Sequence, residues 1–170
     1  MSAAGTPPPG DQARASVLVA VPREEAFRIF TEEIDQWWRS GPQYRALARP
    51  TAILHLEPHA GGRIFETQSG EGDARVIETG RITDWDPPAR FTFRWRASNF
   101  APAEWTNVEV TFASSPSGTL VTVTHRGWSR IRPDHPVRHG QPVAAFIRSN
   151  GLWWGGLLTS LREHAGGTRL

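Results

Sequence analysis

The sequence predicts an α+β fold in which a curved antiparallel β-sheet packs against one long C-terminal helix. The chain reads in order as a strand, a helical segment, six short strands and a long helix. The six strands follow one another through short turns, which favours an antiparallel sheet over βαβ units. One sheet face has to be buried, and the last helix is the largest apolar element available to cover the concave face.

The first strand is predicted at residues 14–21, in the stretch RASVLVAV, and a helix follows at residues 22–34. The helix begins with a proline and two glutamates, which favour the first turn of a helix. Its apolar residues recur at helical spacing: Ala26, Phe27, Phe30 and Ile34. The pair Gly41-Pro42 ends this helical region.

Six further strands are separated by turns rich in glycine, proline and serine. They are predicted at residues 51–58, 63–68, 74–85, 90–96, 107–112 and 119–125. Side chains alternate between the two faces of a strand, so each of the last three strands has a predictable inward face. These inward residues are Phe91, Phe93 and Trp95, then Val108, Val110 and Phe112, then Val121, Val123 and His125.

The last helix is predicted from Val143 to His164. Its apolar residues follow the i, i+3, i+4 pattern: Phe146, Ile147, Trp153, Trp154, Leu157, Leu158 and Leu161. The stretch GLWWGGLLTSL is unusual, because each glycine inside a helix costs about 1 kcal/mol relative to alanine. The glycines would let the helix approach the strands or leave space for a ligand beside the tryptophans. Alternatively, the tryptophans fill that space.

Composition excludes several classes of function. The chain has 170 residues, 19 basic against 17 acidic and no cysteine, so thiol catalysis and disulfides are excluded. Every basic residue is arginine, and the arginines are spread along the chain, so no nucleic-acid partner is predicted. No apolar run is long enough to cross a membrane, so membrane insertion is not predicted. No targeting segment is recognised, which predicts a cytoplasmic protein. The protein is expected to be a monomer or homodimer.

One domain is predicted at residues 13–165, between a disordered N-terminal tail at residues 1–12 and a flexible C-terminal tail at residues 166–170. The length suits a single domain with a sizeable core. The N-terminal residues are small, polar and rich in proline, which is typical of disorder.

Two residues are candidates for catalysis, Glu66 and His125. His125 ends an inward strand face and could act as acid or base, although a core histidine bonded to its neighbours is favoured. Glu66 shares a strand face with Ile64 and is expected to point inward. A buried carboxylate needs a partner, so it is either a general base or, as favoured, a structural anchor paired with arginine.

Other candidates would bind a ligand without reacting. Strand alternation places Glu78 with Gly80 and therefore inward. Asn150 lies on the buried stripe of the last helix, where it could contact a ligand or a strand carbonyl. The aromatic residues either line a pocket or fill a core: Trp95, Phe93, Phe112, Phe146, Trp153 and Trp154, with Trp38 and Trp128 nearer the mouth.

No cofactor and no metal are predicted. His135 and His139 have i, i+4 spacing but lack an acidic third ligand, and the motif HExxH is absent. There is also no glycine-rich phosphate loop between a strand and a helix, and no GxSxG motif.

The pieces VPREEAFRIFTEEIDQWW, LEPHAGGRIFE, GRITDWDPPARFTFRW, VEVTF, TLVTVTHRGW and GLWWGGLL occur in this order. Together they resemble the START-like helix-grip superfamily, also called SRPBCC, and within it the branch named for the activator of heat-shock-protein-90 ATPase. The resemblance covers about residues 15–164. One departure is Thr79-Gly80, where many relatives carry a Trp-Gly pair.

The resemblance implies a cavity between the concave sheet face and the last helix, generally used for apolar small molecules. The first hypothesis is therefore a non-enzymatic module that binds an apolar or aromatic small molecule. The second is a cyclase or hydrolase that uses Glu66 and His125 on a polyketide-like substrate. The third is a co-regulator of a chaperone ATPase. A shared fold does not choose among them.

Overall fold

The computed structural model describes residues 11–47, 51–68, 75–96, 100–132, 134–136 and 140–166. Its strands are β1 (Gln12–Val19), β2 (Ile53–Leu56), β3 (Arg63–Gln68), β4 (Arg75–Asp86), β5 (Arg90–Trp95), β6 (Thr106–Ser115) and β7 (Gly118–Arg126). Its helices are α1 (Arg23–Glu32), α2 (Ile34–Trp37), the short 3-10 helix η1 (Trp128–Arg130) and α3 (Val143–Gly166).

The described strands form one antiparallel sheet in the order β1-β7-β6-β5-β4-β3-β2. Strands β2 to β6 each pair with the next strand in sequence, and β1 pairs with β7. The short turns explain this order, because an antiparallel neighbour needs no crossover helix. The predicted α+β class and the order of the elements are both confirmed.

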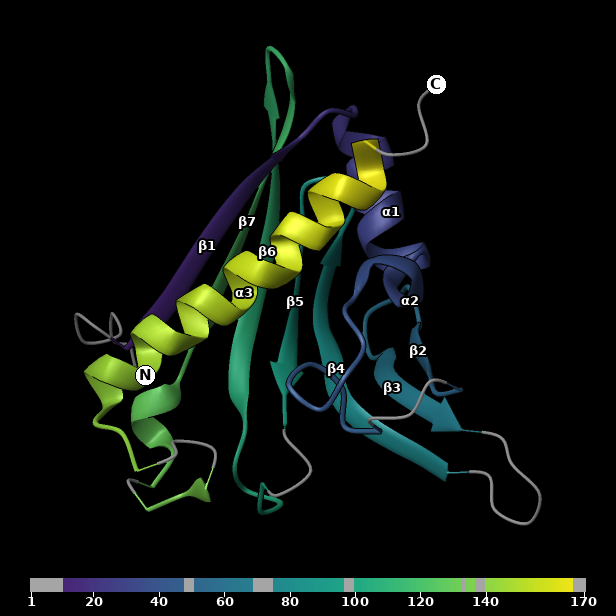
Figure 1. Ribbon diagram of the computed structural model, residues 1–170. Helices are drawn as coiled ribbons and strands as arrows, with labels where there is room; N and C mark the ends of the chain where they lie inside the picture. The colour runs from purple at the N-terminus through teal and green to yellow at the C-terminus, as the bar shows by residue number, and fades with distance from the viewer. Residues whose placement is uncertain are drawn as a thin grey trace, which may run out of the picture.

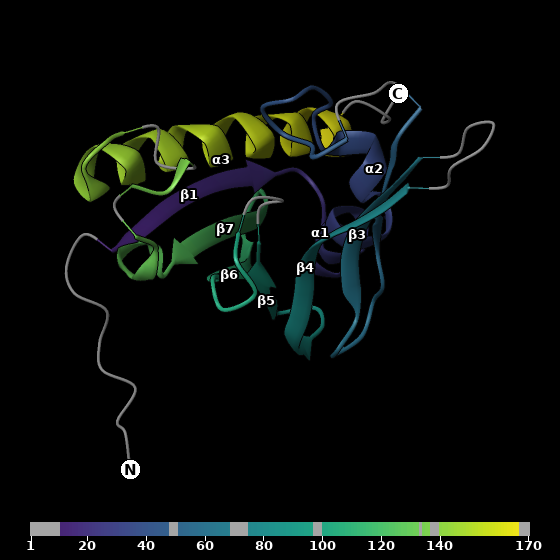
Figure 2. The same ribbon diagram turned by 90° about the horizontal axis from the view of Figure 1, so that it is seen from below.

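The sheet curls around its own concave face, and α3 lies across that face as a second layer (Figures 1 and 2). In Figure 1, α3 runs diagonally past β1, β7 and β6, while α1 and α2 lie beside its C-terminal half. The N-terminal helices therefore close the part of the concave face that α3 leaves uncovered.

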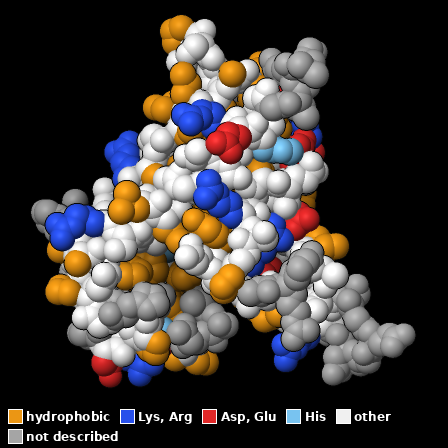
Figure 3. Space-filling model, viewed as in Figure 1, with side chains coloured by type: hydrophobic (Ala, Val, Ile, Leu, Met, Phe, Trp, Pro, Cys, Tyr) orange, Lys and Arg blue, Asp and Glu red, His pale blue; other side chains and the backbone are white. Residues whose placement is uncertain are grey.

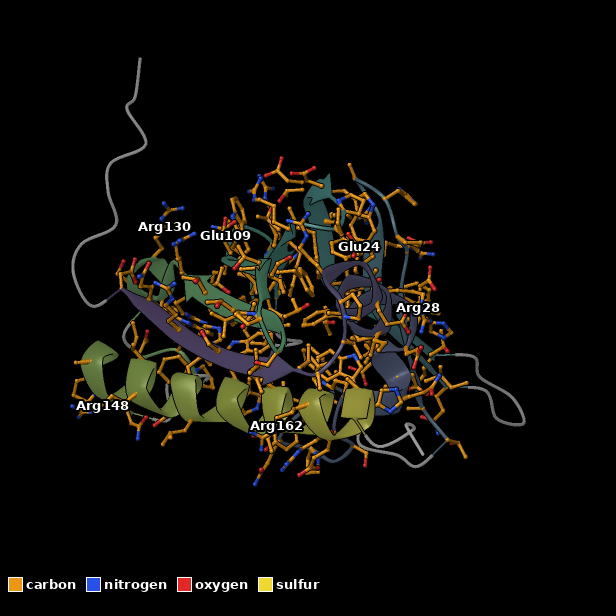
Figure 4. The ribbon with its side chains drawn as sticks, turned by 90° about the horizontal axis from the view of Figure 1, so that it is seen from above. Glu24, Arg28, Glu109, Arg130, Arg148 and Arg162 are labelled. Carbon is orange, nitrogen blue, oxygen red and sulfur yellow. The ribbon has the colours of Figure 1, made fainter. Side chains whose placement is uncertain are left out.

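Helix α3 is amphipathic along its whole length. Its buried residues are Phe146, Asn150, Trp154, Leu157, Leu158, Leu161 and Ala165. Arg148 and Arg162 are exposed and project from the opposite side, away from the sheet (Figure 4). The apolar stripe thus faces the sheet, as its spacing predicts.

The glycines of α3 differ in their surroundings. A methyl group added at Gly156 would lie 3.3 Å from the hydroxyl of Tyr44, so this glycine permits a close approach between α3 and the loop at residues 41–47. At Gly151 the nearest atom is the carbonyl oxygen of Arg14 in β1, at 4.0 Å. Nothing lies within 4 Å of the corresponding position at Gly155.

The core consists of two clusters. The larger one fills the space between α1, α3 and the sheet, and its centre is a group of packed aromatic rings: Phe27, Phe30, Phe91 and Phe112. The smaller one lies at the start of α3 and contains Phe100, Trp128, Ile131 and Phe146. Aromatic residues therefore fill both ends of the interface between sheet and helix.

The elements begin and end at residues that differ from the predicted ones at both ends of the domain and within the first helical segment. Asp11 is buried and accepts a hydrogen bond from the backbone N–H of Ser129 at 2.6 Å, and Gln12 begins β1, so both belong to the domain rather than to the tail. Residues 1–10 and 167–170 of the predicted tails lie outside the described residues, while Gly166 ends α3. The single helix predicted at residues 22–34 is instead divided at Glu33 into α1 and α2.

Burial of α3 against the sheet gives the first testable prediction. Leu157 is fully buried, whereas Leu152 on the same helix is 80% exposed. We expect Leu157→Ala to lower the free energy of unfolding by about 2 to 5 kcal/mol, because it leaves a cavity in the core. Leu152→Ala is the matched control and should change it by less than about 0.5 kcal/mol. Equal losses in urea unfolding would contradict the packing of α3 through this stripe.

Candidate functional site

A cavity of about 190 Å³ lies between the loop at residues 41–47, strands β2 to β5, and α3. We call it the aromatic cavity. It is lined by Trp38, Pro42, Gln43, Tyr44, Arg45, Ala46, Leu54, Glu66, Thr79, Trp95, Arg96 and Trp153. Figure 3 views the molecule from the side of α3, where hydrophobic side chains are exposed across the middle of the face. The rings of Trp38, Tyr44, Trp95 and Trp153 are half-buried and pack against the main core, so they form an apolar wall.

The loop at residues 41–47 is fastened to α2 by Arg45. Its Nη1 donates to Oδ1 of Asp35 at 2.6 Å, and its Nη2 donates to the carbonyl oxygens of Asp35 and Trp38 at 2.9 and 2.7 Å. The side chain of Arg45 is only 6% exposed. A buried guanidinium is stable when its donors are satisfied in this way, so Arg45 fixes the loop rather than offering a free charge.

Glu66 fastens the other side of the same loop. Its two carboxylate oxygens accept hydrogen bonds from the backbone N–H groups of Ala46 at 2.8 Å and Leu47 at 3.0 Å. Glu66 is 2% exposed, so it points inward as predicted. It is a structural anchor, but its partners are backbone amides and not the predicted arginine. The charge-assisted bonds replace the water that the carboxylate loses on burial.

Both tryptophans beside the loop are also bonded to it. The indole N–H of Trp38 donates to the carbonyl oxygen of Tyr44 at 2.9 Å, and that of Trp153 donates to the carbonyl oxygen of Gln43 at 2.7 Å. The ring of Tyr44 stacks on that of Trp153 with centroids 5.6 Å apart. The polar edges of both indoles are therefore satisfied, and their apolar faces remain for the cavity.

His125 takes part in a buried chain of hydrogen bonds. The indole N–H of Trp154 donates to Nδ1 of His125 at 3.1 Å, so the imidazole proton lies on Nε2, which donates to Oγ1 of Thr106 at 2.6 Å. The hydroxyl of Thr106 in turn donates to the carbonyl oxygen of Trp95 at 3.5 Å. Burial lowers the pKa of His125 from 6.5 to about 3, because the charged imidazolium would lose its hydration. This is the core histidine that the sequence analysis favoured.

The structure brings only part of the predicted set to the cavity. Trp38, Glu66, Trp95 and Trp153 line it. The other predicted residues on the concave side are buried elsewhere and do not line it: Phe93, Phe112, His125, Trp128, Phe146, Asn150 and Trp154. They fill the interface between sheet and helix. The adjacent tryptophans of α3 are thus divided, since Trp154 packs in the core while Trp153 borders the cavity.

The prediction that Glu78 faces inward is wrong. Glu78 is exposed and forms an ion pair with Arg81, with Oε1 and Nε 2.8 Å apart. The cause is a β-bulge in β4, where Ile64 pairs with Gly80 but the next residue, Phe65, pairs with Glu78. The extra residue interrupts the alternation of faces, so Glu78 and Gly80 no longer share a side.

Several cavity residues were not predicted. In the sequence, the loop at residues 41–47 showed only a turn signal. Strand alternation predicted that Arg96 lies on the outward face of the sheet, opposite Trp95. Arg96 reaches the cavity because β5 ends at Trp95 and Arg96 follows it. The chain's only tyrosine, Tyr44, directly after Gly-Pro-Gln, was the one compositional signal in the loop.

The described residues contain no group of three or more His, Cys, Asp or Glu side chains that could hold a metal ion, and His139 lies outside them. Within the same residues, no helix is both long and apolar enough to cross a membrane. The amide oxygen of Asn150 is buried and has no hydrogen-bond partner among them.

A curled antiparallel sheet closed by a long C-terminal helix defines the helix-grip class of proteins. Residues 20–145 match the model of the family described as Activator of Hsp90 ATPase homolog 1-like protein. The chain belongs to this family, as the order of the sequence pieces suggested. A comparison with curated proteins finds no match.

Several solved structures have the same fold. A protein from Mesorhizobium loti is 18% identical, with a TM-score of 0.62 over 94% of this chain and 99% of its own. A protein of unknown function from Staphylococcus aureus is 14% identical, with a TM-score of 0.63 over 91% of each chain. An HSP90 activator from Plasmodium falciparum is 16% identical, with a TM-score of 0.60 over 92% of this chain and 96% of its own. These likenesses show the fold alone.

The anchoring role of Glu66 gives a second prediction. In Glu66→Gln the amide can accept from only one of the two loop N–H groups and turns its own NH₂ toward the other. We expect a loss of about 1 to 3 kcal/mol in unfolding free energy and faster hydrogen exchange at the amides of Ala46 and Leu47. Glu78→Gln is the matched control, because Glu78 is exposed on the neighbouring strand. Unchanged exchange at both amides in Glu66→Gln would refute the anchor.

The buried His125 gives a third prediction, on pH dependence. At pH values above 6.5, the pKa of His125 in the unfolded chain, its imidazole is neutral in both the folded and the unfolded state. The contribution of this neutral side chain to the free energy of unfolding is then fully present. Below pH 6.5 the unfolded chain binds a proton that the folded state refuses until about pH 3. Stability should therefore fall by about 1.4 kcal/mol per pH unit within that window. His125→Gln, whose amide can both accept and donate, should remove this slope between about pH 6 and pH 5. A slope equal to that of the unaltered protein would contradict a neutral His125.

Proposed function

We propose that this protein binds a small aromatic molecule in the aromatic cavity. The observation that carries the proposal is the wall of four ring systems, Trp38, Tyr44, Trp95 and Trp153, around about 190 Å³. The indole N–H groups of Trp38 and Trp153 donate to carbonyl oxygens of the loop, so these side chains offer their ring faces to the cavity. Ring faces favour stacked or edge-on contact with another aromatic ring.

The volume limits the size of the ligand. An apolar cavity of about 150 Å³ accommodates benzene, whereas sites for drug-sized molecules measure roughly 300 to 1,000 Å³. A space of about 190 Å³ therefore suits one ring with a short substituent. A polyketide-like substrate with several fused rings exceeds it.

The loop is held ready for binding. Arg45, Glu66 and the two indoles fix its backbone through at least one hydrogen bond each. A wall that is already ordered loses little conformational freedom when a ligand binds, which raises affinity.

The two alternatives have weaker support. A reaction centred on Glu66 and His125 would need free acid or base groups, yet both side chains are buried and spent on internal hydrogen bonds. Co-regulation of a chaperone ATPase rests on the family description and on one structural neighbour at 16% identity. No feature of the described surface adds to it.

The proposal is tested with 4-methylphenol, a neutral single-ring compound. We expect saturable binding by calorimetry and a melting temperature that rises with ligand concentration, because the ligand prefers the folded state. Pyrene, with four fused rings, should give neither signal.

Trp153→Leu should weaken the binding of 4-methylphenol severalfold, because a stacking wall is lost. Trp105→Leu is the matched control, since Trp105 does not line the aromatic cavity. Absence of binding, or equal weakening by both variants, would refute the proposed site.

A further inference from the structure

Arg96 is the charged group of the aromatic cavity that internal contacts leave incompletely satisfied. Its Nη2 donates to the carbonyl oxygens of Phe100 at 3.2 Å and Ala101 at 2.7 Å. Its Nε is buried and has no hydrogen-bond partner within the described chain. No described carboxylate lies within 4.0 Å of its guanidinium nitrogens.

The other two charged residues of the cavity differ from Arg96 in this respect. Arg45 is paired with the carboxylate of Asp35 at 2.6 Å, and three backbone carbonyls accept hydrogen bonds from its Nε and Nη2. Both oxygens of Glu66 accept backbone N–H groups. A partly buried cation with unused donors and no counter-ion is costly, and a ligand that supplies the counter-ion removes that cost.

We propose that the ligand of the aromatic cavity is a single-ring aromatic carboxylate whose negative charge is held by Arg96. This inference rests on the proposed function. The ring meets the indole and phenol faces, and the carboxylate meets the guanidinium, whose planar set of donors suits a carboxylate. Trp95, the last residue of β5, and Arg96, which follows it, both line the aromatic cavity.

A second hollow competes for the same anion. It measures about 400 Å³, lies beside the outward side of β4 and β5, and is lined by Arg94, Arg96 and Trp105 among others. The guanidinium of Arg94 stacks over the ring of Trp105, 4.7 Å from its centroid. Since Arg96 borders both hollows and Arg94 only the outer one, the two arginines distinguish the sites.

The test compares phenylacetate with phenylacetamide, a neutral molecule of the same shape, by calorimetry at about pH 7. We expect the unaltered protein to bind phenylacetate at least about tenfold more tightly, as for a hydrogen bond to a charged group. Arg96→Gln should abolish this preference while phenylacetamide still binds. Arg94→Gln, the matched control on the same strand, should keep the preference.

A measurement on the unaltered protein guards against a variant that fails to fold. Phenylacetate, but not phenylacetamide, should shift the Nε–H resonance of Arg96 in ¹⁵N-labelled protein. Absence of that shift, or equal affinities for the two compounds, would overturn the inference and leave the proposed function standing. Loss of the preference in Arg94→Gln would place the anion in the outer hollow and also overturn it. If neither compound nor 4-methylphenol binds, the proposed function itself fails.

Discussion

The hydrogen bond from the indole of Trp154 to Nδ1 of His125 fixes where α3 lies on the sheet. Apolar contacts alone tolerate small shifts of a helix, whereas breaking this bond would leave two buried polar groups without partners. His125 is held in turn by Thr106, so the helix is tied to both β7 and β6. Trp153 precedes Trp154 in α3, so its side chain projects from the helix about 100° away from that of Trp154, toward the loop at residues 41–47. One buried contact thus directs the ring that borders the cavity.

The cavity exists where the sheet departs from regular pairing. The bulge in β4 places Thr79 beside the cavity, and Gly80 next to it is tightly packed, since an added methyl group would lie 3.1 Å from Ile64 and 3.2 Å from Phe93. The short side chain of Thr79 lines the cavity. The two adjacent tryptophans in GLWWGGLL therefore differ in role: Trp154 fills part of the core, and Trp153 lines the aromatic cavity.

Sequence reasoning succeeded where one periodicity governs a whole element. Strand alternation correctly predicted a group of buried residues, Phe91, Phe93, Val108 and Val110. Helical spacing correctly predicted which side of α3 faces the sheet. It failed at Glu78, because a bulge is a local insertion that leaves no mark in the hydrophobic pattern. It also missed Arg45 and Arg96, since arginine in a loop or at a strand end reads as solvent-exposed. Their hydrogen-bond acceptors lie only four to ten residues away, in α2 for Arg45 and at residues 100 and 101 for Arg96, but only the folded loops bring them within reach.

The distribution of satisfied and unsatisfied polar groups argues for binding rather than for acid–base chemistry. The two groups whose chemistry first suggested catalysis are both used for structure, Glu66 for the loop and His125 for the helix. A general acid or base has to exchange its proton with a substrate within hydrogen-bond reach, and His125 does not border the cavity at all. Within the cavity, the donor without a partner belongs to Arg96, and a guanidinium has donors but no acceptor. In the function we propose, the positive charge of Arg96 beside the aromatic ring faces selects a ligand by its charge and shape.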